Sequence, residues 1–567
     1  MKKAFYLALL AAAFLGLTSA QNLPRNETLY ITGHQWGPPS SFNPVGPVRA
    51  WPVNEGGGFN LIYESLLTFN LVTGDLDPRL AESLTENDAT FVVKLQPGTA
   101  FQDGKPLTSE DVVYSYELGQ RQGVEYSSFW DYVTKVEATD DRTVTFTLNP
   151  DRLNLGQVRN YLTTVAILPK HLWAPLEEQQ DSLTQYANLE PVGSGPYTLK
   201  NANNERIILE RAEKYWGNDV YGQPAPKYLV HPIFASNDAA NLAFSQGQLD
   251  LSQNFIPEVW KLGENEPIST WTNEAPYYLP GSIPMVWMNV NKPGLDNPAV
   301  RRALAYSINY PLIAQTAMSD YSVPVNASLI VPGGGEDSYF DADAVAKDGW
   351  SFDPNKAVEI LEGELGAKKG GDGIYVLPDG TRLGPWEVSA PYGWSDWNQA
   401  LEIVSSSAQA VGIDIKTNFP EQSVWQTNMQ NGNFDLVMNS ATGASAAGPW
   451  PRFRDVLDIR GVPEAGQTAF WNYGRYSNPK VADLLEKAAA ASPEEQGQYY
   501  AQLDEIFRQD VPTLPLMYRP QQFYTFDSSV WHNFPTAENP YAPPMHSQSG
   551  VQVLFNITTE EQTSQAK

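Results

Sequence analysis

Alternating apolar and polar positions predict strands in several parts of the chain. In residues 90–95 (TFVVKL) and 143–148 (TVTFTL), every second side chain is apolar, which is typical of strands with one buried face. Between these strands lies the segment LTSEDVVYSYELGQ, in which Thr108 and Asp111 have the spacing of a capping box. This spacing predicts that a helix begins there.

Several later helices are predicted from a cap residue followed by proline, whose fixed φ suits the first helical position. The pairs are Asn297-Pro298, Asp353-Pro354, Asn478-Pro479 and Ser492-Pro493, and Glu495 completes a capping box with Ser492. Strand-like runs such as PMVWMNV, GIDIKTNF and FDLVMN lie between the helices. Strands and helices that alternate in this way indicate an α/β fold.

The first 20 residues have the pattern of a secretory signal peptide. Lys2 and Lys3 precede an apolar run over residues 4–17, and Thr18-Ser19-Ala20 is a small-x-small cleavage site. No later run approaches the roughly 20 apolar residues that span a bilayer. We therefore expect an exported, periplasmic protein, cleaved near Ala20.

Composition narrows the possible functions. The 567 residues are 42% hydrophobic and 12% aromatic, which indicates a large globular protein. The absence of cysteine excludes disulfides, thiolate sites and a lipidated cysteine anchor. The chain has 37 basic and 65 acidic residues, with a net charge of −28, so we expect no nucleic-acid partner.

The residues Gly443-Ala-Ser445-Ala-Ala447 nearly match the nucleophile elbow G-x-S-x-G and follow a predicted strand. His532 and His546 lie downstream, in the order that such hydrolases use. However, the last glycine is replaced by alanine, and the two prolines of AGPWPRF argue against the helix that must follow an elbow. We interpret the segment as a small-residue loop that another part of the molecule approaches closely.

No other motif predicts catalysis, a metal or a cofactor. The five histidines are His34, His171, His231, His532 and His546, and they lack metal-ligand spacing. A carboxylate pair for glycoside hydrolysis is not marked among the 65 acids, but it is not excluded either. We therefore predict a binding protein without cofactor or metal, and keep a secreted glycosidase as a distant alternative.

The chain is rich in aromatic residues, with 16 Trp and 28 Tyr. Trp394 and Trp397 lie in the segment PYGWSDWNQ, which we predict to be a loop, and Trp36 follows the first strand. In PMVWMNV, Trp287 and Asn289 share one strand face. Exposed aromatic rings beside Asn and Gln suit a neutral polyhydroxylated ligand, because rings cover its C–H faces and amides bond its hydroxyls.

The order of several longer segments resembles that of the family 5 extracellular solute-binding proteins, which deliver ligands to ABC importers. The segments are FVVKLQPGTAFQDGKPLTSEDVVYSYE, PVGSGPYTL, ERAEKYWG, NDAANLAFSQGQLDL, NVNKPGLDNPAVRRALAYSINYPLIA, FDPNKAVEILE and YYAQLDEIFRQDVPTLPLMY. They are spread from Phe91 to Tyr518, so the resemblance extends over nearly the whole mature chain. The resemblance implies a two-lobed periplasmic-binding-protein fold, type II and cluster C-like, with an extra subdomain in the first lobe.

The resemblance also implies a division of the chain and a mechanism. The first lobe would comprise residues 21–55, 165–282 and 525–567, the extra subdomain 56–164, and the second lobe 283–524. The lobes would close on the ligand by hinge motion, and permease subunits in the membrane would bind the closed form. We expect the protein to act as a monomer.

The ligand class depends on one position. Peptide-binding members of the family carry an Asp shortly after the strand that resembles FDLVMN, and the matching position here is Ala444. No acid lies between Asp435 and Asp455, so a buried ammonium group would have no counter-charge there. An acid from elsewhere, such as Asp396, could replace it, so an oligopeptide remains the alternative.

A neutral oligosaccharide is the preferred ligand. The segments WNYGRYSNP, GGGEDSYFD and AKKGGDGIYVLPDGTRLGPW resemble the cello- and manno-oligosaccharide-binding members of the family. The candidate ligand-binding residues are Gln35, Trp36, Trp260, Trp271, Trp287, Asn289, Trp394, Trp397, Trp425, Asn439 and Trp450. We assign Trp130, Trp173, Trp216, Trp350, Trp386, Trp471 and Trp531 to packing.

Overall fold

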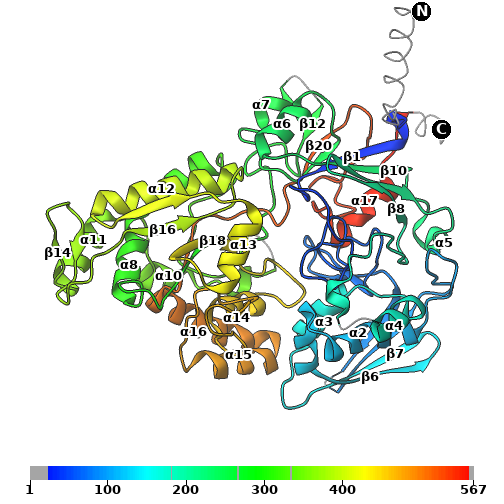
Figure 1. Ribbon diagram of the computed structural model, residues 1–567, viewed down its shortest axis with the longest axis horizontal. Helices are drawn as coiled ribbons and strands as arrows, with labels where there is room; N and C mark the ends of the chain where they lie inside the picture. The colour runs from blue at the N-terminus through cyan, green and yellow to red at the C-terminus, as the bar shows by residue number, and fades with distance from the viewer. Residues whose placement is uncertain (1–22, 88, 180–181, 265–266, 333–334, 561–567) are drawn as a thin grey trace, which may run out of the picture.

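The structure is a computed structural model with two α/β lobes that lie side by side (Figure 1). It describes residues 23–87, 89–179, 182–264, 267–332 and 335–560. The predicted signal peptide lies outside these residues. Over the described residues, no helix is long and apolar enough to cross a membrane.

The first lobe is built on a seven-stranded mixed sheet (Figure 1, upper right). The central strand β1 (Thr28–Thr32) runs parallel to β10 (Tyr228–Pro232) and β11 (Leu251–Ser252). The other strands are β8 (Tyr197–Ala202), β9 (Arg206–Arg211), β12 (Ile268–Ser269) and β20 (Thr525–Asp527). Its helices include α5 (Asn218–Tyr221), α6 (Asn237–Ser245), α7 (Trp260–Gly263) and α17 (Val553–Asn556).

A four-stranded antiparallel sheet and its helices lie below the first lobe in Figure 1. The strands are β4 (Ala81–Glu86), β5 (Thr90–Leu95), β6 (Val133–Asp140) and β7 (Thr143–Leu148), and β2 (Leu67–Phe69) and β3 (Leu76–Pro78) form a separate hairpin. The helices are α2 (Ser109–Arg121), α3 (Leu155–Thr164) and α4 (Lys170–Gln179).

The predictions for this part are confirmed. Strands β5 and β7 have the predicted bounds, and α2 begins with the predicted capping box, in which the Thr108 N–H donates to Asp111 Oδ2 at 2.9 Å. Local signals were sufficient here because each alternating strand has one face on the core.

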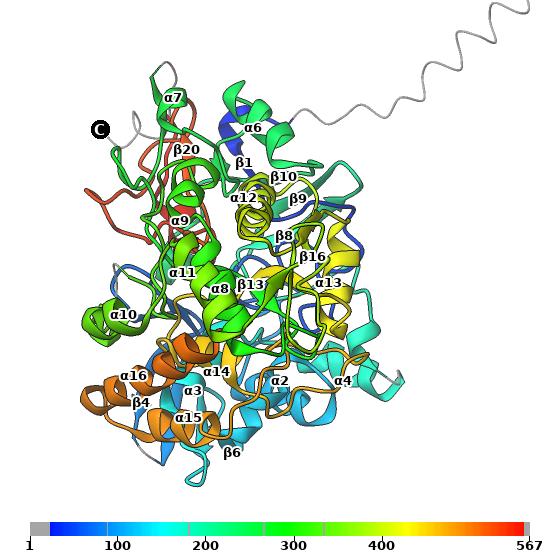
Figure 2. The same cartoon turned by 90° about the vertical axis from the view of Figure 1, so that its left-hand side faces the viewer.

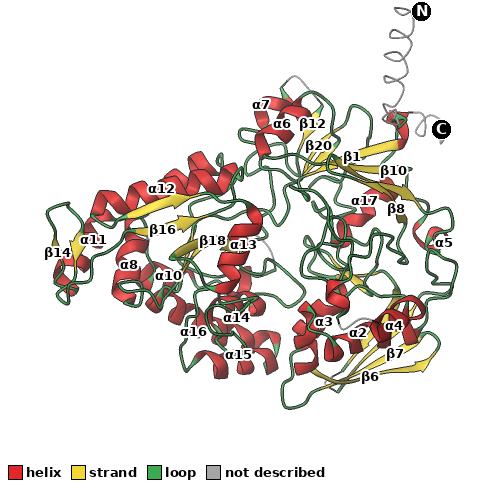
Figure 3. Ribbon diagram, viewed as in Figure 1, coloured by secondary structure: helices red, strands yellow, loops and turns green. Residues whose placement is uncertain are grey.

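The second lobe contains a five-stranded sheet that helices surround (Figures 2 and 3). In spatial order the strands are β17 (Ile415–Asn418), β16 (Trp386–Ser389), β18 (Leu436–Ser440), β13 (Pro284–Met288) and β19 (Thr513–Pro515). The longer helices are α8 (Pro298–Ser307), α12 (Ser395–Val411), α13 (Gln422–Asn431), α14 (Trp450–Leu457), α15 (Val481–Ala490) and α16 (Pro493–Asp510). Shorter ones are α9 (Tyr310–Leu312), α10 (Ala342–Asp348) and α11 (Pro354–Glu359), and β14 (Lys368–Lys369) pairs with β15 (Tyr375–Val376).

Proline marks the start of three helices as predicted. Helices α8, α11 and α16 begin at Pro298, Pro354 and Pro493, and the side chain of Asn297 accepts from Ala299 N–H. Helix α15 begins at Val481, two residues after Pro479, because the Asn478 side chain accepts from Lys480 N–H in a preceding turn.

Two local predictions are wrong. The segment around Trp394 is not simply a loop: Trp394 is the N-cap of α12, and Trp397 lies in its first turn with only 5% of its surface exposed. The prolines after the small-residue loop do not prevent a helix, because α14 begins at Trp450 between Pro449 and Pro451. The first helical turn needs no backbone N–H bonds within the helix, so proline is tolerated there.

Two crossing segments join the lobes and hydrogen-bond to each other. The N–H groups of Gly281 and Ser282 donate to Arg519 O at 3.0 and 2.9 Å, and Arg519 N–H donates to Ser282 O at 3.0 Å. The N–H of Ala444, in the small-residue loop, donates to Gly281 O at 2.7 Å. The small-residue loop is thereby attached to one of these crossing segments.

The lobes also touch on either side of the space between them. Asn237 Nδ2 of α6 donates to Ser395 Oγ of α12 at 3.2 Å. At another point Gly156 lies so close to the small-residue loop that a Cβ there would be 3.1 Å from Ala447 Cα. The lobes are therefore closed on each other.

Candidate ligand-binding site

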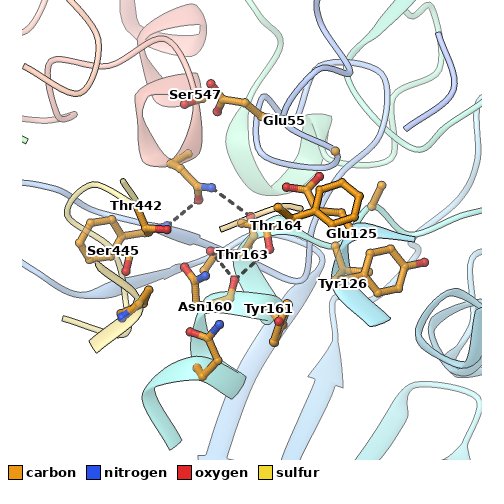
Figure 4. A pocket seen from close by; sticks show the side chains of 18 of the residues that line it. Glu55, Glu125, Tyr126, Asn160, Tyr161, Thr163, Thr164, Thr442, Ser445 and Ser547 are labelled. Atoms are coloured by element: carbon orange, nitrogen blue, oxygen red, sulfur yellow. Dashed lines mark hydrogen bonds between the residues drawn. The ribbon is translucent and has the colours of Figure 1, made fainter. Parts of the chain in front are cut away.

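A cavity of about 410 Å³, called the large cavity below, lies between the lobes. One wall comes from α3 and the loops around Glu55 and Glu125, and the other from the small-residue loop, the start of α14 and Trp471. In Figure 4, Thr442 and Ser445 of the second lobe lie across from Asn160 and Thr163 of α3. The volume falls in the usual range for small-molecule sites.

Several polar atoms on the walls of the large cavity are buried without a partner among the described residues. They are Asn54 Oδ1, Gln157 Oε1, Gln521 Oε1 and Trp471 Nε1. Leaving such groups unpaired costs about 1–3 kcal/mol each, so they favour a ligand that supplies both donors and acceptors.

Most charges around the large cavity are paired within the protein. Arg49 bonds Glu125 at 2.6 Å, and Arg454 bonds Asp455 at 2.7 Å. Arg454 also lies over the Trp471 ring, 4.8 Å from its centroid. Glu55 differs: its side chain is exposed toward the cavity and accepts from Gln522 Nε2 at 3.0 Å, and desolvation by the surrounding walls raises its pKa.

The small-residue loop faces the large cavity through Thr442, Ala444 and Ser445. Gly443 packs against the crossing segment at Gly281, where a Cβ would lie 2.6 Å from Gly281 O, so a close approach explains the glycine as predicted. Ser445 Oγ accepts from Ala447 N–H at 3.3 Å, whereas His532 pairs through its backbone with Thr558 and the His546 ring bonds to His34. No histidine is among the described residues that line this cavity, which gives no support to a nucleophile elbow.

A second cavity of about 100 Å³, called the small cavity, lies where α6 meets α12. It is lined by Trp36, Asn237, Gln253, Asn254 and Phe255 from the first lobe and by Trp394, Asp396, Trp397 and Arg519 from the second lobe and hinge. Three tryptophans and three amide side chains thus surround one space.

Polar groups of the small cavity are buried and unpaired. Asn254 is only 2% exposed, and neither its Oδ1 nor its Nδ2 has a partner among the described residues. Trp397 Nε1 is likewise unpaired, as is Gln253 Oε1, although Gln253 Nε2 donates to Gly33 O at 2.6 Å. Because buried amides are normally bonded, this arrangement indicates a site completed by a ligand.

The small cavity contains one acid, and this acid is neutralised. Asp396, 2% exposed, accepts from Arg519 Nε at 3.0 Å. The Arg519 guanidinium also stacks over the Phe523 ring, 4.4 Å from its centroid. Asp396, which we considered as a replacement for the missing peptide anchor, therefore already has a counter-charge.

Three histidines contact one another near the cavities; His231 and His546 are buried and His34 is half-buried. His34 precedes Trp36 of the small cavity by two residues, and His546 lies between Met545 and Ser547 of the large cavity. His34 Nε2 is 2.9 Å from His546 Nδ1, and the His34 N–H donates to His231 Nε2 at 3.0 Å. Burial lowers the pKa of His231 to about 4 and that of His546 to about 3, so both are neutral at pH 7.

The structure brings Trp36, Trp394 and Trp397 together in the small cavity. Trp425 packs behind them, with its ring centroid 5.8 Å from that of Trp394. Gln35 is near but its amide is used internally, since Oε1 accepts from Trp51 N–H and Nε2 donates to Gly37 O.

The other predicted residues lie outside both cavities. Trp287 is 1% exposed and donates to Asn439 O, and Asn289 donates to Gly432 O and Phe434 O. The prediction for these two fails because β13 lies between β18 and β19 with every side chain buried, so a shared strand face does not mean an open one. Asn439 is half-buried on β18 and lines neither cavity.

Three further tryptophans are placed elsewhere. Trp271 is buried, and Trp260 stacks on Tyr277 beside a separate cavity of about 340 Å³. Trp450 lines another cavity of about 290 Å³, where its Nε1 donates to Leu485 O. Its ring meets Tyr132 edge-on, so Trp450 serves the contact between lobes rather than the large cavity.

Sequence reasoning missed part of the large cavity. Trp471 was assigned to packing but lines this cavity, together with Asn54, Gln157 and Gln521. No local pattern marks these residues, because they come from four distant segments. The packing assignment holds for Trp173, Trp350, Trp386 and Trp531, which are buried, and Trp216 donates to Glu64.

Similar proteins have the same fold. Residues 75–454 match the family model described as bacterial extracellular solute-binding proteins, family 5 Middle. A periplasmic oligopeptide-binding protein of an ABC transporter from Thermotoga maritima, solved with bound mannohexaose, is 32% identical, with a TM-score of 0.88 over 95% of this chain and 99% of that chain.

Two curated relatives have names that refer to peptides. A probable peptide-binding protein, YejA, from Agrobacterium fabrum is 25% identical over 85% of this chain and 83% of its own length. The glutathione-binding protein GsiB of Escherichia coli is 26% identical over 77% of this chain and 80% of its own. These relatives are binding proteins, not enzymes, which argues against the glycosidase alternative. Since the family model covers more than half of the residues, the chain belongs to family 5 of the bacterial extracellular solute-binding proteins.

Proposed function

We propose that this protein binds a neutral oligosaccharide of the cello- or manno- class between its lobes and presents it to an ABC importer. Proteins of this family work with the permease and ATPase subunits of such transporters. The observation that carries the proposal is the combination of aromatic rings and unpaired buried amides in the small cavity.

The wall chemistry supports a polyhydroxylated ligand. Asn254 presents a donor and an acceptor, Gln253 an acceptor and Trp397 a donor, all without partners in the described structure. Each sugar hydroxyl both donates and accepts, so one ring can satisfy this mixed set. The rings of Trp36 and Trp394 offer flat apolar surfaces for its C–H faces.

The position of Ala444 supports a neutral ligand. It lies on the wall of the large cavity, where the peptide-binding members of the family would place an anchoring carboxylate. A buried ammonium without a counter-charge costs several kcal/mol, so the neutral position 444 disfavours a free amino terminus next to it. The Thermotoga maritima protein, solved with mannohexaose, is consistent with this choice.

A binding protein of this kind catalyses no reaction, so its function requires only that the two lobes close on the ligand. The crossing segments at Gly281 and Arg519 supply a hinge, and both lobes contribute to both cavities. Ligand contacts made by both lobes stabilise the closed form, which the permease then recognises. We propose the lobe boundaries at about residues 283 and 524 for this movement, and export to the periplasm by the N-terminal signal.

A peptide remains the second candidate because of Glu55. Its carboxylate faces the large cavity without a directly bonded Lys or Arg among the described residues, so it is available to a cation. The names of the Agrobacterium fabrum and Escherichia coli relatives point the same way.

Isothermal titration tests the proposal. Mannohexaose, cellotetraose, trialanine and glutathione would be titrated into the mature protein at pH 7. We expect a dissociation constant in the micromolar range or below for at least one oligosaccharide and no heat from the peptides. Binding of trialanine or glutathione without any oligosaccharide response would overturn the proposal.

A further inference from the structure

We infer that Arg519 determines ligand specificity in the small cavity: it neutralises Asp396 and thereby makes this cavity select an uncharged ring instead of an ammonium group. The inference rests on the proposed function, because it specifies how the same cleft recognises its ligand. The inference goes beyond the proposed function because it assigns ligand selectivity to Arg519, a residue that no sequence motif marks.

The pair is well placed for this role. Asp396 lies in the first turn of α12, on the second lobe, and Arg519 lies on a crossing segment whose backbone bonds to Ser282. Their side chains are joined by Arg519 Nε and Asp396 Oδ2 at 3.0 Å. Stacking on Phe523 holds the guanidinium in this orientation.

Without Arg519 the cavity would have the opposite selectivity. Asp396 is the one acid among the described lining residues, and tryptophan rings surround it. A buried carboxylate without a partner attracts a cation strongly, because water screens it poorly. The small cavity would then resemble an ammonium site with aromatic walls, where cation–π attraction adds to the charge.

Arg519 also offers donors to the ligand. Its bond to Asp396 uses Nε, and neither Nη group donates to an acceptor within the described part of the chain. Two terminal NH₂ groups therefore remain at the cavity wall for sugar hydroxyls. Together with Asn254, Gln253 and Trp397, they form a set that contains both donors and acceptors and, with Asp396 paired, carries no net charge.

A purely structural ion pair is the competing explanation, since Arg519 also belongs to the hinge. The two explanations differ in one measurable property. A structural pair affects stability and all ligands alike, whereas a selectivity pair changes the preference between a free amine and its acetylated form.

The test uses the mature protein with the variants Arg519→Gln, Asp396→Asn and the double variant. Arg382→Gln is the control, because Arg382, which pairs with Asp372 and Asp414 at 2.9 Å each, lies on the same lobe as Asp396 and lines neither cavity. Mannohexaose, cellotetraose, trialanine and N-acetyl-trialanine are titrated at pH 7, where the α-amino group of trialanine is mostly protonated.

For Arg519→Gln we expect at least about tenfold weaker oligosaccharide binding, from the loss of charged donors. We also expect trialanine to bind at least about tenfold more tightly than N-acetyl-trialanine, since only the free amine pairs with Asp396. Asp396→Asn should show no amine preference. The double variant should lose the amine preference while its oligosaccharide affinity stays low, and Arg382→Gln should match the wild type.

The inference is overturned if Arg519→Gln binds oligosaccharide within twofold of the wild type and does not distinguish the two peptides. Should Arg519→Gln not fold, the double variant decides, because it leaves no uncompensated charge: oligosaccharide affinity within twofold of the wild type would overturn the inference. Wild-type protein that binds trialanine but no oligosaccharide would refute the proposed function instead. In that case, a rise in amine preference in Arg519→Gln would still support the role of Arg519.

Discussion

The large and small cavities lie in one cleft but have different walls. The large cavity is lined by loops and helix ends that carry five charged residues, namely Arg49, Glu55, Glu125, Arg454 and Asp455. The small cavity is lined by tryptophans and amides around a single ion pair. Its key polar group, Asn254, is almost fully buried, whereas Glu125 of the large cavity is 65% exposed at its side chain.

This difference indicates a division of roles. Packed rings and buried amides hold their geometry, so the small cavity is suited to recognising one unit of a ligand. The exposed carboxylates of Glu55 and Glu125 rearrange at low cost, so the large cavity is suited to accommodating the remainder of the ligand. His34, His231 and His546 hydrogen-bond to one another, with His34 two residues before Trp36 of the small cavity and His546 between Met545 and Ser547 of the large cavity.

The largest expected effect comes from Trp397→Ala. Trp397 is buried against Trp394 and Trp425, with centroid distances of 4.9 and 6.3 Å, so its removal leaves a void in the small cavity. We expect the free energy of unfolding to fall by about 3–5 kcal/mol and oligosaccharide affinity to fall at least about 100-fold. Urea denaturation and isothermal titration measure both.

Trp471→Ala is the matched change in the large cavity, where the ring is only half-buried beneath Arg454. Trp471→Ala should lower the free energy of unfolding by less than about 2 kcal/mol and weaken oligosaccharide binding about tenfold. If Trp471→Ala proves more damaging than Trp397→Ala on both measures, the proposed roles of the two cavities are reversed.

Acid should disrupt the histidine cluster. The pKa of His231 is about 4 in the folded protein and about 6.5 when unfolded, so the unfolded chain binds more protons between these values. The stabilisation that neutral His231 contributes is therefore fully present above about pH 6.5 and is lost as the pH falls toward 4. Between pH 7 and 5 this amounts to about 2 kcal/mol for His231 alone.

His231→Gln isolates this contribution. Between pH 7 and pH 5, the free energy of unfolding of the variant should fall by about 2 kcal/mol less than that of the wild type. Asp250 and Asp504, whose pKa values burial raises to about 6, act in the opposite direction in both proteins and cancel in the difference. Equal pH slopes for the two proteins would show that His231 is not buried in neutral form.

A smaller effect, with opposite signs for stability and binding, is expected from Asn254→Leu. Removing an unpaired buried amide should leave the unfolding free energy unchanged or raise it by about 1 kcal/mol, while oligosaccharide affinity falls about tenfold. The control is Asn43→Leu, because the Asn43 amide is fully buried and donates to Leu183 O and Tyr186 O at 2.8 Å. That variant should lose about 2 kcal/mol or more. A similar loss for Asn254→Leu would mean that its amide is bonded in the free protein.

The smallest effect is expected from Glu55→Gln in the large cavity. With a neutral ligand, oligosaccharide affinity should stay within about twofold of the wild type, because the amide keeps its hydrogen-bonding capacity. Glu125→Gln, which breaks the pair with Arg49, is the control. A loss of tenfold or more for Glu55→Gln alone would identify a cationic ligand and favour the peptide alternative.

Local patterns predicted much of the fold but little of the cleft. The bounds of β5 and β7, the capping box of α2 and the proline starts of α8 and α11 depend on neighbouring residues, so they could be read directly. Trp287 shows the limit: its strand was predicted correctly, yet neighbouring strands and packing cover the ring. Periodicity gives the face on which a side chain lies, and tertiary packing decides whether that face is open.

The sequence by itself determined the α/β class, the helix starts, the family resemblance and the uncharged loop that carries Ala444. Only the tertiary structure decided which polar groups line the cleft and which of them are paired. Asp396 appears in the sequence as a free acid between two tryptophans, but Arg519, 123 residues away, neutralises it across the hinge. The charge and hydrogen bonding of a site depend on groups that come into contact only in the folded protein. Their spacing in the sequence does not predict which of them will be in contact.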